Sequence, residues 1–217
     1  MKKVTFFGIL LFSFFATPAF CQNVGIGTTT PGFKLDVKDG SINTDSVYRI
    51  AGNTVLSVIG FGNLFAGKNS GTANTIGMYN TAVGESSLAS NINGDANTAS
   101  GKNSLELNTS GNENVATGYR ALSTNTIGSQ NTATGSFALL LNTTGSYNTA
   151  SGAGTLFYNT TGRYNTATGK DALRENINGS YNTATGVEAL KNNSSGEFNS
   201  AHGYLALFNN QGGVQNT

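Results

Sequence analysis

The sequence predicts an all-β protein, a parallel β-roll (β-solenoid) built from coils of 17 residues. Three observations predict this fold. The chain repeats itself every 17 residues over most of its length of 217 residues, and six positions of the repeat never change. Two of these positions are glycine and two are asparagine, and both residues tolerate the left-handed backbone of tight turns.

The repeat reads N-T-A-x-G-x-x-A-L-x-x-N-x-x-G-x-x, and eight complete copies fill residues 80–215 without insertion or deletion. The unchanged residues stand at positions one (Asn), three (Ala), five (Gly), nine (Leu), twelve (Asn) and fifteen (Gly). A unit this short can bury its apolar side chains only against the next copy, so the copies must stack. A degenerate copy at 63–79 keeps Gly67 and Gly77 in phase but lacks the alanine and the leucine. We expect it to cap the array.

Within each coil, the Y-N-T-A-T-G segment predicts a short strand, because it alternates and is rich in β-branched residues. Alternation places Ala and the first Asn on one face, and the residues of positions two and four on the other. The position before the first Asn, aromatic in several copies, is assigned to the threonine face. Both glycines are predicted to form corners with positive φ. The second side, for example 187–193, fits either a second strand or one turn of helix.

Stacked coils lie about 4.8 Å apart, so identical side chains form columns. Columns of asparagine can hydrogen-bond amide to amide along the axis, while Ala and Leu form a narrow core. A core this thin favours self-association. The predicted structural ladder comprises Asn97, Asn114, Asn131, Asn148, Asn165, Asn182, Leu122, Leu139, Leu173 and Leu190.

The chain begins with Lys2, Lys3 and a short apolar stretch that ends in small residues. This pattern predicts a secretory signal peptide over residues 1–21 and no membrane span in the mature chain. Cys21 is the only cysteine, and the bulky Phe20 before it argues against lipidation. We expect a secreted or outer-surface protein without disulfides or a thiolate metal site.

Composition and spacing argue against several classes of function. The net charge of +1 gives no reason to expect nucleic-acid binding. His202 is the only histidine and has no partner for catalysis or metal binding. The acids Asp171, Glu175, Glu188 and Glu197 occupy variable positions and are interpreted as solvated side chains, without the cluster that a sugar-cleaving β-helix needs. We therefore expect no enzyme activity and no cofactor.

The motifs NTAVG, NTASG and NTATG, each followed by AL, resemble the head repeats of YadA-like trimeric autotransporter adhesins over residues 63–217. The family's unit is shorter and uses Ser-Val-Ala-Ile where this chain has Thr-Ala-Thr. The resemblance implies a homotrimer that attaches to a host, matrix or glycan surface.

The segment 23–56 looks like the start of secreted, tail-fibre-like surface proteins, where it begins a trimeric β-stalk. The resemblance implies a β-stalk-like segment over 22–62, and the alternation after residue 46 predicts a strand pair with its turn at Gly52 and Asn53. Such proteins often end in a self-cleaving chaperone or a membrane anchor. Here the repeat segment 80–217 holds eight copies and only the first residues of a ninth. We therefore expect a truncated fragment.

Two functions remain open. The first is a non-enzymatic adhesion rod, in which repetition multiplies weak contacts. The second is ice binding by the stacked Thr-x-Thr face, although position four departs from threonine at Val83, Ser100, Ser151 and His202. The candidate ligand-contact residues are Tyr147, Tyr164, Tyr181, Thr132, Thr166 and Thr183.

Overall fold

The computed structural model describes residues 24–26, 35–37, 47–50 and 53–217, and these residues form strands and turns without a helix. The chain divides into two compact units, residues 1–44 and 45–217. In the first, β1 (Val24–Ile26) pairs in parallel with β2 (Leu35–Val37). The predicted signal peptide and Cys21 lie outside the described residues. Among the residues that are described, no helix has the length and apolar character needed to cross a membrane.

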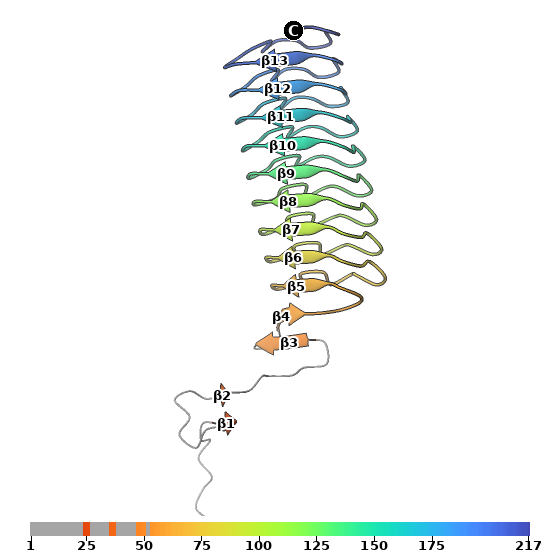
Figure 1. The fold of residues 1–217 in the computed structure, drawn as a ribbon, viewed down its shortest axis with the longest axis vertical. Helices are drawn as coiled ribbons and strands as arrows, with labels where there is room; N and C mark the ends of the chain where they lie inside the picture. Colours follow the sequence, from red (N-terminus) through yellow and green to blue (C-terminus); the bar gives the residue numbers. More distant parts are fainter. Residues whose placement is uncertain (1–23, 27–34, 38–46, 51–52) are drawn as a thin grey trace, which may run out of the picture. The chain divides into compact units, whose positions relative to one another are not determined.

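The second unit is a parallel β-roll, which confirms the predicted fold class (Figure 1). Its sheet has eleven strands whose spatial order follows the chain. Paired residues in β6 to β13 are 17 apart, as in Ala150 opposite Ala167. The repeat strands are β5 (Leu64–Ala66), β6 (Thr81–Val83), β7 (Thr98–Ser100), β8 (Val115–Thr117), β9 (Thr132–Thr134), β10 (Thr149–Ser151), β11 (Thr166–Thr168), β12 (Thr183–Thr185) and β13 (Ser200–His202).

An antiparallel strand pair precedes the coils. Strand β3 (Val47–Ile50) pairs with β4 (Asn53–Ser57), and β4 pairs antiparallel with β5, where Leu56 lies opposite Ala66. The predicted strand pair is therefore present. Asn53 begins β4 rather than forming the turn, and residues 51–52 are outside the described ranges. Because β4 takes up the hydrogen bonds of β5, the first edge of the parallel sheet is covered.

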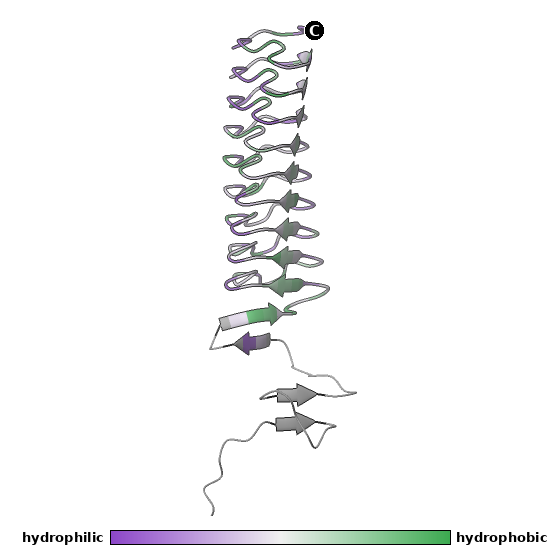
Figure 2. Cartoon of the chain, turned by 90° about the vertical axis from the view of Figure 1, so that its left-hand side faces the viewer, coloured by the Kyte–Doolittle hydropathy of each residue, from purple (hydrophilic) through white to green (hydrophobic). Residues whose placement is uncertain are grey.

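The core of each coil is one leucine with one or two alanines, the second alanine standing at position eight in several copies. Alanine at position three and leucine at position nine are fully buried through most of the array, as at Ala150 and Leu156, both 0% exposed. Burial of a leucine contributes about 2 kcal/mol. Strands line one side of the roll and turns line the other (Figure 2).

The degenerate first coil fills its core with a large residue at position three and a small one at position nine, the reverse of the other coils. Phe65 takes the alanine position and is 1% exposed, while Gly71 takes the leucine position. A Cβ on Gly71 would collide with the Phe65 ring, so the ring occupies the space that leucine fills elsewhere. The coil stays in register, and the Asn80 backbone N–H donates to Asn63 Oδ1 at 2.7 Å.

Neither alternative for the second side of the coil is correct, because this side is made of turns. Position nine is left-handed in every complete copy, with φ between 47° at Leu207 and 53° at Leu156. Positions seven and seventeen are also left-handed, and each such non-glycine residue costs roughly 1–2 kcal/mol. Hydrogen bonds between coils hold them: Leu139 N–H donates to Thr155 O at 2.9 Å and Leu141 N–H to Phe157 O at 3.0 Å.

The two invariant glycines differ in backbone conformation, which corrects the prediction that both have positive φ. Position five has φ between 119° and 137° and needs glycine for its backbone. Position fifteen is not left-handed. There a Cβ would collide with the carbonyl oxygen of the equivalent glycine in the next coil, as at Gly145 against Gly162. A Cβ at position five would likewise meet the carbonyl oxygen of the next coil, as at Gly135 against Gly152, so both glycines allow successive coils to approach closely.

Two columns of buried asparagine hydrogen-bond along the axis. At position one, Asn148 Oδ1 accepts from the backbone N–H of Asn165 at 3.1 Å, and Asn148 Nδ2 donates to Gly162 O at 2.9 Å. At position twelve, Asn159 Nδ2 donates to Asn142 Oδ1 at 2.8 Å and to Gly162 O at 3.1 Å. Because each amide satisfies backbone groups as well as its neighbour, these polar side chains can be fully buried.

We predict that Asn148→Ala lowers the free energy of unfolding by about 2–4 kcal/mol. The substitution leaves the Asn165 N–H buried without its acceptor and removes a donor from Gly162 O. Thr149→Ala, at the adjacent exposed position, is the control. Urea unfolding followed by circular dichroism measures both. Equal stability of the two variants would contradict a structural role for the column.

We predict that Ala96→Gly raises the free energy of unfolding by about 1 kcal/mol, because Ala96 is exposed and held at φ 55°. Ala153→Gly, at an exposed position without positive φ, should lower it. The same urea titration reports both changes. A loss of stability in Ala96→Gly would show that the left-handed backbone carries no strain there.

Candidate binding face

The outward side chains at positions two and four of β6 to β13 form one surface, which we call the strand face. Its most regular part spans β9 to β12, where the eight outward residues are seven threonines and one serine. The alternation predicted from the sequence explains this, because the alanine between each pair points into the core. Thr132 and Thr166 are exposed and Thr183 is half-buried. The strand face of β9 to β12 therefore carries hydroxyl and methyl groups and no charge.

The hydroxyls of the strand face are available to a ligand. On the turn side, threonine hydroxyls donate to a carbonyl of the next coil, as Thr126 does to Thr143 O at 2.9 Å and Thr143 to Thr160 O at 3.1 Å. The threonines of β9 to β12 have no such partner among the residues that the structure describes. Their hydroxyls face solvent and can bind water or another hydroxyl group.

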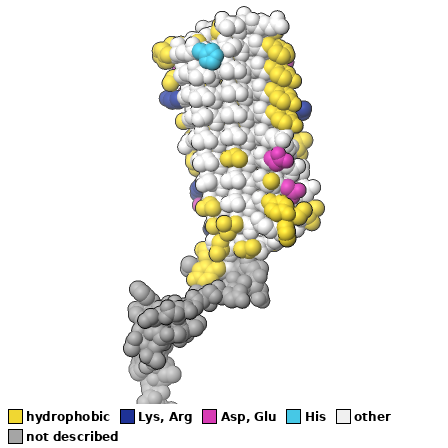
Figure 3. All heavy atoms as spheres, viewed as in Figure 1, with side chains coloured by type: hydrophobic (Ala, Val, Ile, Leu, Met, Phe, Trp, Pro, Cys, Tyr) yellow, Lys and Arg dark blue, Asp and Glu magenta, His cyan; other side chains and the backbone are white. Residues whose placement is uncertain are grey.

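The strand face is less regular towards both ends. Val83 and Val115 are 46% and 38% exposed and replace a hydroxyl with an apolar group. In β13, His202 occupies position four, and its Nε2 lies 3.4 Å from Ser200 Oγ. Figure 3 shows this histidine exposed on the upper part of the face.

An aromatic column accompanies the C-terminal coils. Its members are Tyr147, Tyr164, Tyr181 and Phe198, at position seventeen of four successive coils, and each is 45–50% exposed. Neighbouring rings are nearly parallel, with centroids 4.7, 5.0 and 4.8 Å apart and interplanar angles of 5°, 10° and 3°. Figure 3 shows a column of hydrophobic side chains beside the white strand face over these coils.

The aromatic column differs in two ways from the sequence-based expectation that its rings lie on the threonine face and contact a ligand. Position seventeen is a left-handed corner, with φ 62° at Tyr147 and 55° at Tyr164, so period-two alternation does not govern it. The stacking also covers most ring faces with the next ring. The column consequently presents ring edges, and the Tyr147, Tyr164 and Tyr181 hydroxyls have no protein partner in the described part of the chain.

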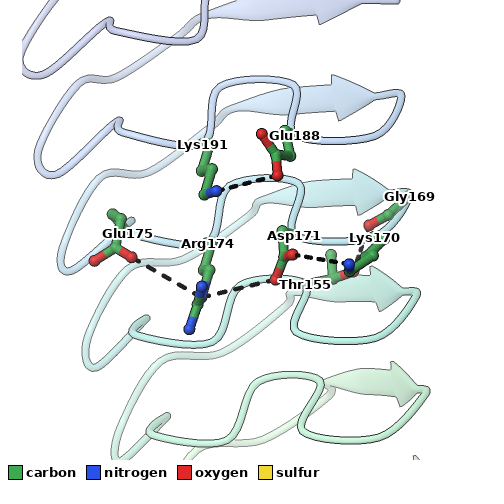
Figure 4. Close-up of polar contacts among 8 residues, drawn as sticks. All are labelled: Thr155, Gly169, Lys170, Asp171, Arg174, Glu175, Glu188 and Lys191. Carbon is green, nitrogen blue, oxygen red and sulfur yellow. Dashed lines mark hydrogen bonds and ion pairs between the residues drawn. The ribbon is translucent and has the colours of Figure 1, made fainter. Parts of the chain in front are cut away.

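The turn side carries an aromatic and charged cluster that the sequence analysis missed. The Arg174 guanidinium lies 5.2 Å from the Phe157 ring centroid and 5.8 Å from that of Tyr158. Arg174 Nε is 3.7 Å from Asp171 Oδ1, and Lys191 Nζ is 3.1 Å from Glu188 Oε1 (Figure 4). Part of the signal was available in the sequence, because the variable positions beside Leu139 and Leu156 are apolar or aromatic in these two copies, at Phe137, Leu140, Leu141, Phe157 and Tyr158.

These contacts correct the interpretation of Asp171 and Glu188 as solvated side chains, while Glu197 is exposed as expected. The Asp171 side chain is only 14% exposed and pairs with a cation, as Glu188 does. Elsewhere on the roll, Glu85 and Lys102 form a 2.9 Å ion pair. The hydrogen bond from Lys102 lowers the pKa of Glu85, and the same bond raises the pKa of Lys102. Both groups are near half exposure, so solvent screens their attraction.

The described residues contain no group of three or more His, Cys, Asp or Glu side chains placed to hold a metal ion. The structure instead places the predicted contact residues in two adjacent columns, threonine on the strand face and tyrosine at its edge. The predicted ladder residues, including Asn97, Asn182 and Leu190, lie buried behind them. No family model matches the chain, and no curated protein or solved structure gives a significant match.

Proposed function

We propose that the protein is a non-enzymatic, secreted or surface-displayed rod that attaches to a cell or matrix surface through its strand face. One observation supports this most directly: β9 to β12 present the same outward hydroxyl residues in register, coil after coil. A hydroxyl contact alone is weak, contributing about 1 kcal/mol. A row of them acts as linked sites whose combined affinity far exceeds that of one.

Self-association, as a homotrimer, is part of this proposal. Each coil buries one leucine and one or two alanines as its apolar core, which is little for a roll of this length. The first coils also expose large apolar side chains, among them Ile76 at 70%, Tyr79 at 58% and Phe61 at 65%. Exposed apolar surface of this kind favours contact with another chain. The resemblance to trimeric adhesin heads supports the same stoichiometry.

Ice binding is a second candidate, favoured by the paired threonines of β9, β11 and β12. Thr132 with Thr134, Thr166 with Thr168 and Thr183 with Thr185 form a regular grid of methyl and hydroxyl groups. The grid spacing is about 4.8 Å between coils and about 7 Å along a strand. A regular, uncharged surface of this type can order water molecules.

We predict that the triple variant Thr132→Lys, Thr166→Lys and Thr183→Lys loses attachment at least about tenfold, equivalent to about 1.4 kcal/mol. Three lysines would place charges on the neutral strand face, and removing water from their ammonium groups on attachment costs free energy. The matched control places three lysines at exposed positions away from it, in Ser136→Lys, Thr161→Lys and Asn178→Lys. Binding of the full chain to cells and to matrix-coated beads measures the effect. Equal binding by both triples would exclude the strand face.

We predict that, if the threonine grid binds ice, the wild-type chain separates its melting and freezing temperatures at micromolar concentration. The lysine triple on the strand face should lose this thermal hysteresis, because charged side chains break the grid, while the control triple keeps it. Nanolitre osmometry measures the gap. Absence of hysteresis in the wild type removes ice binding and leaves the attachment proposal in place.

A further inference from the structure

We propose that the aromatic column and the adjacent threonines form a track for a linear, uncharged polysaccharide lying parallel to the roll axis. This inference rests on the proposed attachment function and names its ligand class. The track consists of Tyr147, Tyr164 and Tyr181 with Thr149, Thr166 and Thr183, two residues further along each coil.

Regular spacing is the first argument. The ring centroids follow one another at 4.7 and 5.0 Å across three coils, the separation imposed by strands hydrogen-bonded side by side. An extended, β-linked sugar chain advances by a closely similar length with each residue. Successive sugars therefore meet successive coils and find the same two side chains each time.

The exposed chemistry is the second argument. Because interplanar angles of 5° and 10° place the rings face against face, a sugar cannot lie flat on an individual ring inside the column. What remains outward is the ring edge and the tyrosine hydroxyl, which both donates and accepts a hydrogen bond. The threonines add a second row of hydroxyls. Hydroxyl groups of a sugar chain match this double row.

Charge is the third argument. The outward residues of β10 to β12 are threonine and serine, without a cation or an anion. An acidic polysaccharide gains no ion pair from these strand residues and would lose hydration, whereas a neutral chain loses little. Arg163, the exposed residue before Tyr164, is the nearest cation to the track in the sequence. The track also has ends: Phe198 lacks a hydroxyl, and Gln130 holds the equivalent position before Tyr147. It therefore covers three coils and needs several linked sugars, because single hydroxyl contacts are weak.

The decisive variant is the triple Tyr147→Phe, Tyr164→Phe and Tyr181→Phe, which keeps the stacked rings and removes only the hydroxyls. Tyr119→Phe, at another exposed tyrosine with an aromatic neighbour, is the matched control. The probes are neutral β-linked glucose and N-acetylglucosamine oligomers of increasing length, titrated calorimetrically into the full chain, with an anionic polysaccharide alongside. Thermal unfolding of all three proteins verifies that they are folded.

We expect affinity to rise with oligomer length, to fall at least about tenfold in the triple variant, and to stay unchanged in the control. Unchanged binding by the triple variant, equal affinity for monomers and long chains, or preference for the anionic polymer would each overturn the inference. If the wild type attaches to cells or matrix but binds no neutral oligomer, the polysaccharide track is wrong and the attachment function stands. Failure to attach to any surface removes both.

Discussion

The fold depends on one constraint, the close vertical approach of identical residues in successive coils. Glycine at positions five and fifteen permits this approach, because any larger residue would meet the carbonyl oxygen of the next coil. The asparagine columns require it, since each amide reaches the coil beside it, as Asn159 reaches Asn142 at 2.8 Å. Together they explain why eight copies tolerate no insertion. A single extra residue would move every column out of line.

The interior is as much polar as apolar. Each coil buries two asparagines, at positions one and twelve, and one leucine, and the amides hydrogen-bond to backbone groups and to the asparagine of the neighbouring coil. Since several residues per coil adopt an unfavourable backbone, the stability of one coil depends on the presence of its neighbours. The outward threonines and tyrosines take no part in the core packing or the asparagine columns. Outward positions can therefore vary while the interior stays constant.

The sequence predicted the length of the coil and which repeated side chains are buried or outward. The 17-residue period, the buried alanine and leucine, and the outward threonines follow from spacing and alternation. Three features did not follow. Left-handed Leu139 contradicts the propensity of leucine, and hydrogen bonds between coils override that propensity. The exchange at Phe65 and Gly71 is visible only when the two positions are seen to share one space. The cluster around Arg174 lies at variable positions, where a consensus carries no information.

The antiparallel strand β4 has a consequence for biogenesis. It pairs with β5 ahead of the first complete repeat, so a paired edge can be present before that repeat folds. Each following coil can then pair with the exposed edge of a folded coil. The loop that must close is only one repeat long. The coils would then fold in order from the N-terminal end of the array, each one on the coil before it.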